Sequence, residues 1–187
     1  MKRFQRLFFF GGFLIFLGFL ASCQSEIDRD LIAVNELKKS LPEDVNKLDI
    51  QQLPSNADSI LESFIKKYPK HMESEFLCFQ LVNITGKRGE TEKLKSAQWA
   101  DFYLKNYQNN KARRLDMAMY GAYYFEKFGV YDDALRLYEL IRDSFPENPM
   151  SQGAAESARM IRSGLVTPEQ QLEALLKQQG DSTTSTK

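Results

Sequence analysis

The chain has 187 residues, of which 25 are basic and 25 acidic, so its formal net charge is zero. Three basic residues and no acidic residue lie before position 23, so residues 23–187 carry a net charge of −3. A neutral or slightly acidic chain lacks the basic surface that binding to nucleic acid requires. The length suffices for one domain with a modest hydrophobic core.

The first residues of the chain combine a basic start with a short apolar run. Lys2, Arg3 and Arg6 precede the 14-residue run 7–20, and small residues follow it. Such a run is shorter than the roughly 20 residues that span a bilayer, and this order is typical of a secretory signal. We therefore predict a signal peptide over residues 1–22, cleaved between Ser22 and Cys23. An uncleaved N-terminal anchor is the alternative.

The sequence Leu20-Ala21-Ser22-Cys23 resembles the lipobox of bacterial lipoproteins. The resemblance implies a lipid anchor on Cys23, which becomes the acylated first residue of the mature protein, and hence a membrane as one partner. In the best-known sorting scheme of that family, an Asp after the lipidated cysteine retains the protein in the inner membrane. Here that residue is Gln24, which favours the outer membrane and leaves open which of its two faces the protein occupies.

Few residues of the chain could support catalysis or metal binding. Beyond Cys23 the remaining cysteine is Cys78, and the apolar run 75–82 around it predicts a buried thiol. The single histidine, His71, follows Tyr68-Pro69-Lys70 in an evident turn, where we expect it to be solvated. Phosphate-binding loops and nucleophile motifs are absent from the sequence. We therefore predict no catalytic residue, no metal site and no cofactor.

The segment after Cys23 is polar and is punctuated by Pro42 and Pro54. Its short apolar pattern from Leu31 to Leu41 suits a brief helix, so we assign residues 23–54 to the lipidated cysteine and a tether with one or two weak helices. If flexible, a tether of roughly 30 residues would extend on the order of 30 Å. The folded part could then stand off the membrane.

From residue 55 onward the sequence signals are helical, and residues 180–187 are predicted to form a disordered tail. Ser55 and Asp58 form the expected cap of the first of these helices, and Gly86 is expected at a break. The predicted helices cover residues 55–68, 74–85, 90–106, 113–128, 132–144, 149–163 and 168–179.

Three of the predicted helices share one pattern, at offsets of 39 and then 38 residues. Each has a small residue, apolar residues four and seven positions later, and an aromatic residue near its end. Internal periodicity of this kind indicates stacked helical hairpins. The matching positions are Ala57, Leu61, Phe64, Tyr68 and Pro69; Ser96, Ala100, Tyr103, Tyr107 and Gln108; and Ala134, Tyr138, Ile141, Phe145 and Pro146.

The last of these units resembles a tetratricopeptide repeat (TPR), and looser units precede it. The resemblance rests on Leu115, Ala118, Gly121, Ala122, Phe125, Gly129, Tyr131, Ala134, Tyr138, Ile141 and Pro146. It implies an all-α fold, namely a short right-handed TPR-like solenoid of helical hairpins over residues 55–179. The terminal helix would act as the cap that such solenoids require.

The same resemblance implies a ligand groove on the first helix of each repeat. The groove residues that it implies are Glu73, Phe76, Gln80, Asn83, Asp116, Met119, Tyr123 and Glu126. Packing against a neighbouring helix is the alternative, above all for Phe76 and Met119. Trp99 lies on a second helix, where outer packing or docking of the tether is favoured over ligand binding.

These features together predict a non-catalytic protein of the bacterial cell envelope. We expect a lipid-anchored docking scaffold that binds other envelope proteins, with outer-membrane assembly or maintenance as a possible setting. The alternative is a solute-binding or glycan-binding lipoprotein that uses a tyrosine-rich groove around Tyr120, Tyr123 and Tyr124.

Overall fold

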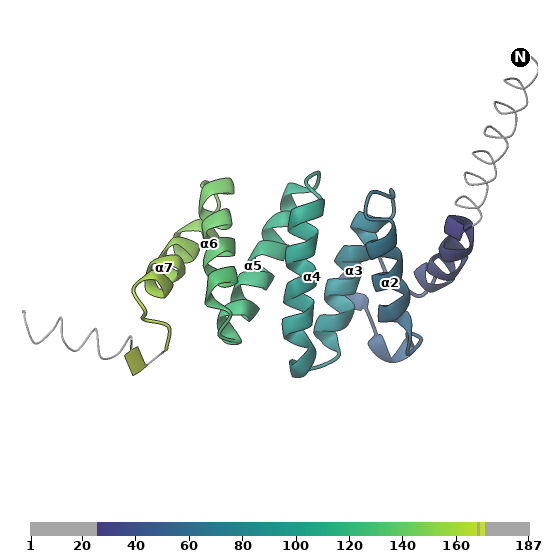
Figure 1. Cartoon of the computed structure of the whole chain (residues 1–187), viewed down its shortest axis with the longest axis horizontal. Helices are drawn as coiled ribbons and strands as arrows, with labels where there is room; N and C mark the ends of the chain where they lie inside the picture. The colour runs from purple at the N-terminus through teal and green to yellow at the C-terminus, as the bar shows by residue number, and fades with distance from the viewer. Residues whose placement is uncertain (1–25, 168, 171–187) are drawn as a thin grey trace, which may run out of the picture. The chain divides into compact units, whose positions relative to one another are not determined.

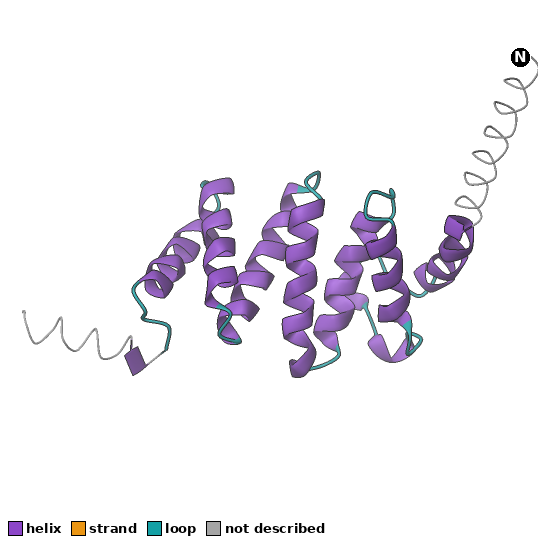
Figure 2. Cartoon of the chain, in the orientation of Figure 1, coloured by secondary structure: helices purple, strands orange, loops and turns teal. Residues whose placement is uncertain are grey.

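A computed structural model describes residues 26–167 and 169–170, and within these every regular element is helical. The all-α prediction is therefore confirmed for this part of the chain (Figure 2). The predicted signal peptide, its cleavage site, Cys23, most of the predicted helix 168–179 and the tail 180–187 lie outside the described residues. The chain divides after Gln80 into two compact units, which we call unit 1 and unit 2.

Unit 1 contains the segment that the sequence assigns to a tether. Residues 26–38 are helical, and the 3-10 helices η1 (Val45–Lys47) and η2 (Ile50–Gln52) precede α2 (Ala57–Lys67). Helix α3 (Ser74–Lys87) begins in this unit (Figure 1). The supposed tether is folded, because its apolar side chains at helical and turn spacings are buried. These buried residues are Val34, Leu37, Leu41, Leu48 and Leu53.

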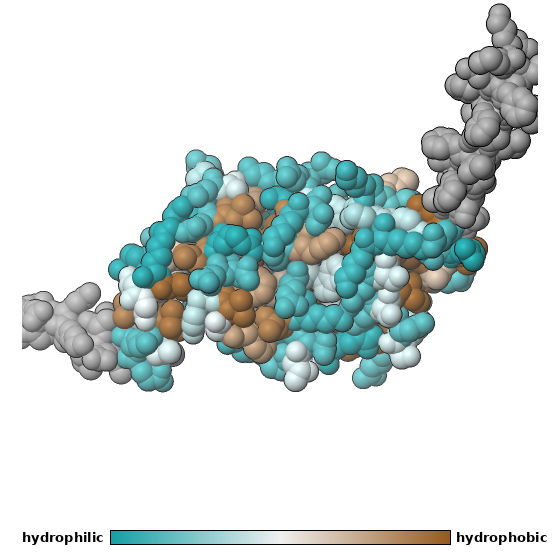
Figure 3. Space-filling view, viewed as in Figure 1, coloured by the Kyte–Doolittle hydropathy of each residue, from teal (hydrophilic) through white to brown (hydrophobic). Residues whose placement is uncertain are grey.

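Unit 2 contains the end of α3, the 3-10 helix η3 (Glu90–Glu92) and four further helices. These are α4 (Lys93–Asn106), α5 (Lys111–Lys127), α6 (Tyr131–Ser144) and α7 (Met150–Arg162), and each packs on the next in chain order. Hydrophilic residues cover most of the face drawn in Figure 3, with apolar residues showing in smaller patches among them. The buried residues of α4, α5 and α6 are mostly apolar, so each of these helices packs its apolar side against its sequence neighbours.

Two glycines in unit 2 mark close approaches between helices. A Cβ at Gly121 in α5 would lie 2.7 Å from Leu137 Cδ1 and 3.8 Å from Ala100 Cβ, so α4 and α6 both approach α5 there. Gly86 lies inside α3, whereas the sequence predicted a helix break at this residue. Because glycine has no Cβ, the Tyr120 hydroxyl can occupy the space next to the Gly86 backbone. Gly129, in contrast, has a φ of 74° at the turn between α5 and α6, where L-residues are disfavoured.

The first three positions of each repeated set are buried positions of α2, α4 and α6. The small residues Ala57, Ser96 and Ala134 are fully buried, and the two residues that follow each of them in its set are buried as well. Each helix also ends in the same way: Tyr68, Tyr107 and Phe145 donate their backbone N–H to the residue four positions earlier. The sequence periodicity therefore corresponds to a repeated local structure.

The end of each of these three helices is held by a side chain from the helix that follows. Ser74 Oγ donates to the Tyr68 carbonyl at 2.6 Å, and Arg114 donates to the Tyr107 carbonyl at 2.6 Å. Ser151 Oγ likewise donates to the Phe145 carbonyl. These bonds satisfy carbonyl groups that a helix end leaves without a partner, so they fix where the next helix begins.

Two local predictions in unit 1 were wrong. The N-cap of α2 is Asn56 rather than Ser55, and its side chain makes no capping hydrogen bond. His71 is half-buried rather than solvated, because its ring lies edge-on to Phe64 with centroids 5.3 Å apart. Its Nδ1 accepts the Glu73 backbone N–H at 3.3 Å, so the imidazole completes the turn before α3.

The fully buried Ala134 tests the repeat alignment. Ala134→Leu adds three carbon atoms to a site without free space, so we expect it to lower the free energy of unfolding by ~1–3 kcal/mol. The fluorescence of Trp99, which is buried in α4 of the same unit, can follow urea unfolding. Gln98→Leu, at an exposed position of α4, is the control. Equal unfolding midpoints for both variants would contradict the alignment.

Candidate functional site

Helix α5 carries the part of the predicted groove that lies wholly in unit 2. At 3.6 residues per turn, Asp116, Met119, Tyr123 and Glu126 fall within about 80° of one another around the helix axis. The buried residues of α5, which include Gly121 and Phe125, lie roughly on the opposite side. The structure therefore brings these four residues onto one surface stripe, which we call the α5 stripe.

Tyr123 is the most accessible apolar residue of the α5 stripe, at 54% exposed. Its ring packs edge-on against Tyr124 at 4.9 Å, and Tyr124 packs against Tyr120 at 4.7 Å. Lys93 Nζ lies 5.1 Å from the centre of the Tyr124 ring, so that ring already has a cationic partner. Tyr123 is thus held in place from one side while its other side remains open. Met119, next to it on the stripe, is half-buried.

The two acidic residues of the α5 stripe differ in their surroundings. The Glu126 carboxylate accepts the hydroxyl of the buried Tyr138 at 2.5 Å, so it links α5 to α6. This role was not predicted, and it makes Glu126 a packing residue as well as a surface acid. Burial, followed by the Glu126 hydrogen bond, raises the pKa of Tyr138. Asp116 is exposed, and partial desolvation raises the pKa of its carboxyl group.

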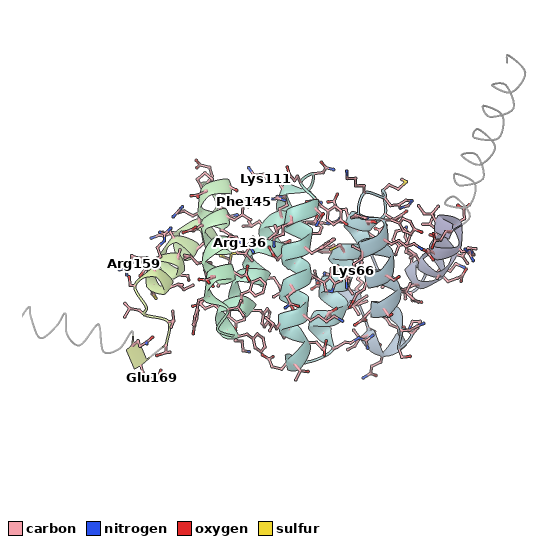
Figure 4. All side chains as sticks on the ribbon, viewed as in Figure 1. Lys66, Lys111, Arg136, Phe145, Arg159 and Glu169 are labelled. Carbon is pink, nitrogen blue, oxygen red and sulfur yellow. The ribbon has the colours of Figure 1, made fainter. Side chains whose placement is uncertain are left out.

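A cavity of about 520 Å³ lies at the N-terminal end of α5. Ala112 and Leu115 line one side, on the helix face that also carries Asp116 and Met119. The segment 145–149 between α6 and α7 lines the other side, and Lys111 Nζ lies 5.8 Å from the Phe145 ring centre (Figure 4). Sequence reasoning missed this cavity. Its signal was the pair of prolines, Pro146 and Pro149, which hold the connecting segment away from a continuous helix.

The remaining predicted groove residues lie on α3, apart from Glu73 just before it, and three of the four belong to unit 1. Residues 38–42, at and just after the end of the helix 26–38, contact all three. Lys38 Nζ lies 2.6 Å from the Glu73 carboxylate and 5.9 Å from the Phe76 ring centre.

Gln80 is fully buried, which contradicts its predicted place in an open groove. The Gln80 amide donates to the Pro42 carbonyl at 2.9 Å, so the chain's own N-terminal part covers this residue. Asn83, which belongs to unit 2, is half-buried. Among the predicted groove residues, those with exposed side chains are therefore Asp116 and Tyr123 of the α5 stripe.

Cys78 is fully buried, as predicted, and burial raises the pKa of its thiol, which keeps it protonated. Over residues 26–167 and 169–170, no cluster of His, Cys, Asp and Glu could hold a metal ion. None of the helices in this same part of the chain is both long and apolar enough to cross a membrane.

The chain was compared with protein-family models, with curated proteins and with solved structures, and none of these matches it.

Proposed function

We propose that this protein is a non-catalytic, lipid-anchored docking protein of the bacterial cell envelope, whose partner protein binds the α5 stripe. The observation that carries the proposal is Tyr123, an aromatic side chain that is 54% exposed yet positioned by Tyr124. Aromatic residues held at a surface next to partly buried apolar neighbours are typical anchors of protein interfaces. The cavity beside Leu115 extends the same surface and could accept an apolar side chain of the partner.

The proposed architecture is a short right-handed TPR-like solenoid. The repeated burial of Ala57, Ser96 and Ala134 supports it, as do the side chains that hold the ends of α2, α4 and α6. The consecutive packing of α4 to α7 in unit 2 is the order that stacked helical hairpins require. In this scheme α5 is a first helix of a repeat, the position at which such solenoids carry their ligand surface.

The proposed location rests on the sequence around Cys23. A short apolar run that ends in Leu20-Ala21-Ser22-Cys23 supports a lipid anchor, and Gln24 after the cysteine favours the outer membrane. A docking surface on a protein anchored there would meet other envelope proteins. Outer-membrane assembly or maintenance is the setting that we propose.

Replacement of Tyr123 by alanine tests the docking surface. We expect Tyr123→Ala to weaken partner binding by upwards of ~1 kcal/mol, because interface energy concentrates in a few aromatic anchors. The helical content should be unchanged, since the side chain is mostly exposed. The measurement is quantitative capture of envelope proteins by wild-type and variant protein, followed by the affinity for the protein that is captured in stoichiometric amounts.

The matched control is Phe128→Ala. Phe128 is also an exposed aromatic residue, at 38%, and it is the C-cap of α5. It lies about 140° around the helix from Tyr123, away from the α5 stripe. Capture that is the same for wild type, Tyr123→Ala and Phe128→Ala would show that the stripe is not the docking surface.

A second function, binding of a small solute or glycan, is supported by one observation. The cavity of about 520 Å³ between Leu115 and Phe145 is within the range of small-molecule sites, about 300–1,000 Å³. A solute that binds there should raise the thermal midpoint of the purified protein, and Leu115→Trp, which fills the cavity, should abolish the shift. Protein docking on Tyr123 predicts no such shift with solutes or glycans.

A further inference from the structure

Within unit 1, the lead segment, residues 26–53, is bound to the end of α2 near its start and to α3 near its middle. Near its start, the Lys67 ammonium donates to Glu26 at 2.5 Å and to Asp30 at 2.8 Å. The Tyr68 hydroxyl donates to the same Asp30 carboxylate at 3.0 Å. The hydrogen bond from Lys67 is the main cause that lowers the pKa of Asp30. Further along, Pro42 accepts the Gln80 amide.

Buried apolar side chains hold the lead segment more strongly than these exposed ion pairs do. Val34 is fully buried and Leu37 nearly so, one helical turn apart on the same face of the first helix. Exposed ion pairs contribute little to stability, whereas burial of such side chains is the main stabilising term. The ion pairs therefore fix the orientation of a segment that apolar packing keeps in place.

This attachment leaves very little chain between the packed part of unit 1, which begins at Glu26, and the proposed lipid anchor on Cys23. Two residues, Gln24 and Ser25, separate Cys23 from Glu26, the first helical residue of the lead segment. Three consecutive Cα–Cα steps span at most about 11 Å. We infer that unit 1 lies directly against the lipid surface that holds Cys23, with the end where Glu26 meets Lys67 as its contact surface. The inference rests on the lipid anchor proposed above.

The charges at this end of unit 1 indicate which lipid surface it fits. The basic residues of the lead segment's start and the end of α2 are equal in number to the acids there: Arg29, Lys66, Lys67 and Lys70 against Glu26, Asp28, Asp30 and Glu62. A balanced surface gains little from anionic lipid, since attraction to such membranes scales with clustered Lys and Arg. The short connection, rather than charge, therefore holds unit 1 at the membrane. The contact should form on neutral lipid and should be insensitive to salt.

The test couples the Cys23 thiol of the chain 23–187 to a maleimide lipid in phosphatidylcholine vesicles. Cys78 is fully buried and its thiol stays protonated, so coupling is selective for Cys23. A fluorescent amino acid replaces Met72, which is 87% exposed in the loop after α2, and an energy acceptor is placed on the vesicle lipid. We expect strong energy transfer that does not change with salt. Hydrogen exchange of residues 28–38 should remain slow on the vesicles.

The comparison protein carries a 20-residue Gly/Ser linker between Ser25 and Glu26. Such a linker adds a mean separation of about 25 Å, so energy transfer should be largely lost. The same linker added after Lys187 is the control and should leave the transfer unchanged. Equal transfer with and without the linker at Ser25, or fast exchange of residues 28–38, would overturn the inference. Because the coupling is chemical, failure of lipidation in the cell would not affect this result.

Discussion

Replacement of Cys23 by alanine is expected to abolish lipidation completely and to leave the precursor uncleaved. Alanine has no thiol to which the lipid can be attached, so no partial effect is expected. A single acyl chain is a marginal anchor at about 0.8 kcal/mol per buried CH₂, so stable attachment takes more than one chain. The measurement is incorporation of labelled fatty acid together with the apparent mass of the protein in membrane fractions.

The other cysteine supplies the matched control. Cys78→Ala removes a buried thiol from α3 and should leave labelling and processing as in the wild type. Wild-type protein that takes up no labelled fatty acid and appears in the soluble fraction would refute the lipid anchor. If Cys23→Ala still takes up the label and Cys78→Ala does not, the modified residue is Cys78 and not Cys23.

The sequence predicted those features that depend on local spacing. Apolar periodicity located the helices, and the recurring positions within them, such as Ala134 and Ile141, are buried. Periodicity cannot tell whether a short amphipathic segment has a neighbour to pack on, so residues 26–53 were assigned to a tether. The same limit explains Gln80, a polar residue whose burial depends on a carbonyl group 38 residues earlier in the chain.

The candidate site was predictable in part for the same physical reason. Helical spacing suffices to place Asp116, Met119 and Tyr123 on one face of α5, because that face follows from the 3.6-residue turn. The cavity beside Leu115 forms between α5 and the connection from α6 to α7, so the two prolines of that connection indicate a break in the helix but not the neighbour that completes the cavity. Likewise, the bond from Tyr138 to Glu126 joins two helices, and no pattern within α5 indicates it.

Truncation of Leu137 should have the largest effect on stability among the variants considered. Leu137 is fully buried in α6, and its Cδ1 faces Gly121 of α5. Leu137→Ala should therefore lower the free energy of unfolding by ~2–5 kcal/mol, the sum of lost apolar burial and the cavity that remains. Urea unfolding followed by Trp99 fluorescence measures this change.

The contact between Leu137 and Gly121 predicts that the effect of Gly121→Ala on stability depends on the residue at position 137. Alanine favours helix by about 1 kcal/mol over glycine, yet Gly121→Ala should destabilise the wild type, because its Cβ would lie 2.7 Å from Leu137 Cδ1. In the Leu137→Ala background that overlap is gone, so the same substitution should become stabilising. Gly153→Ala on α7, where an added Cβ meets nothing within 4 Å, should be stabilising in both backgrounds. An unchanged sign for Gly121→Ala in the two backgrounds would mean that α5 and α6 do not meet at these residues.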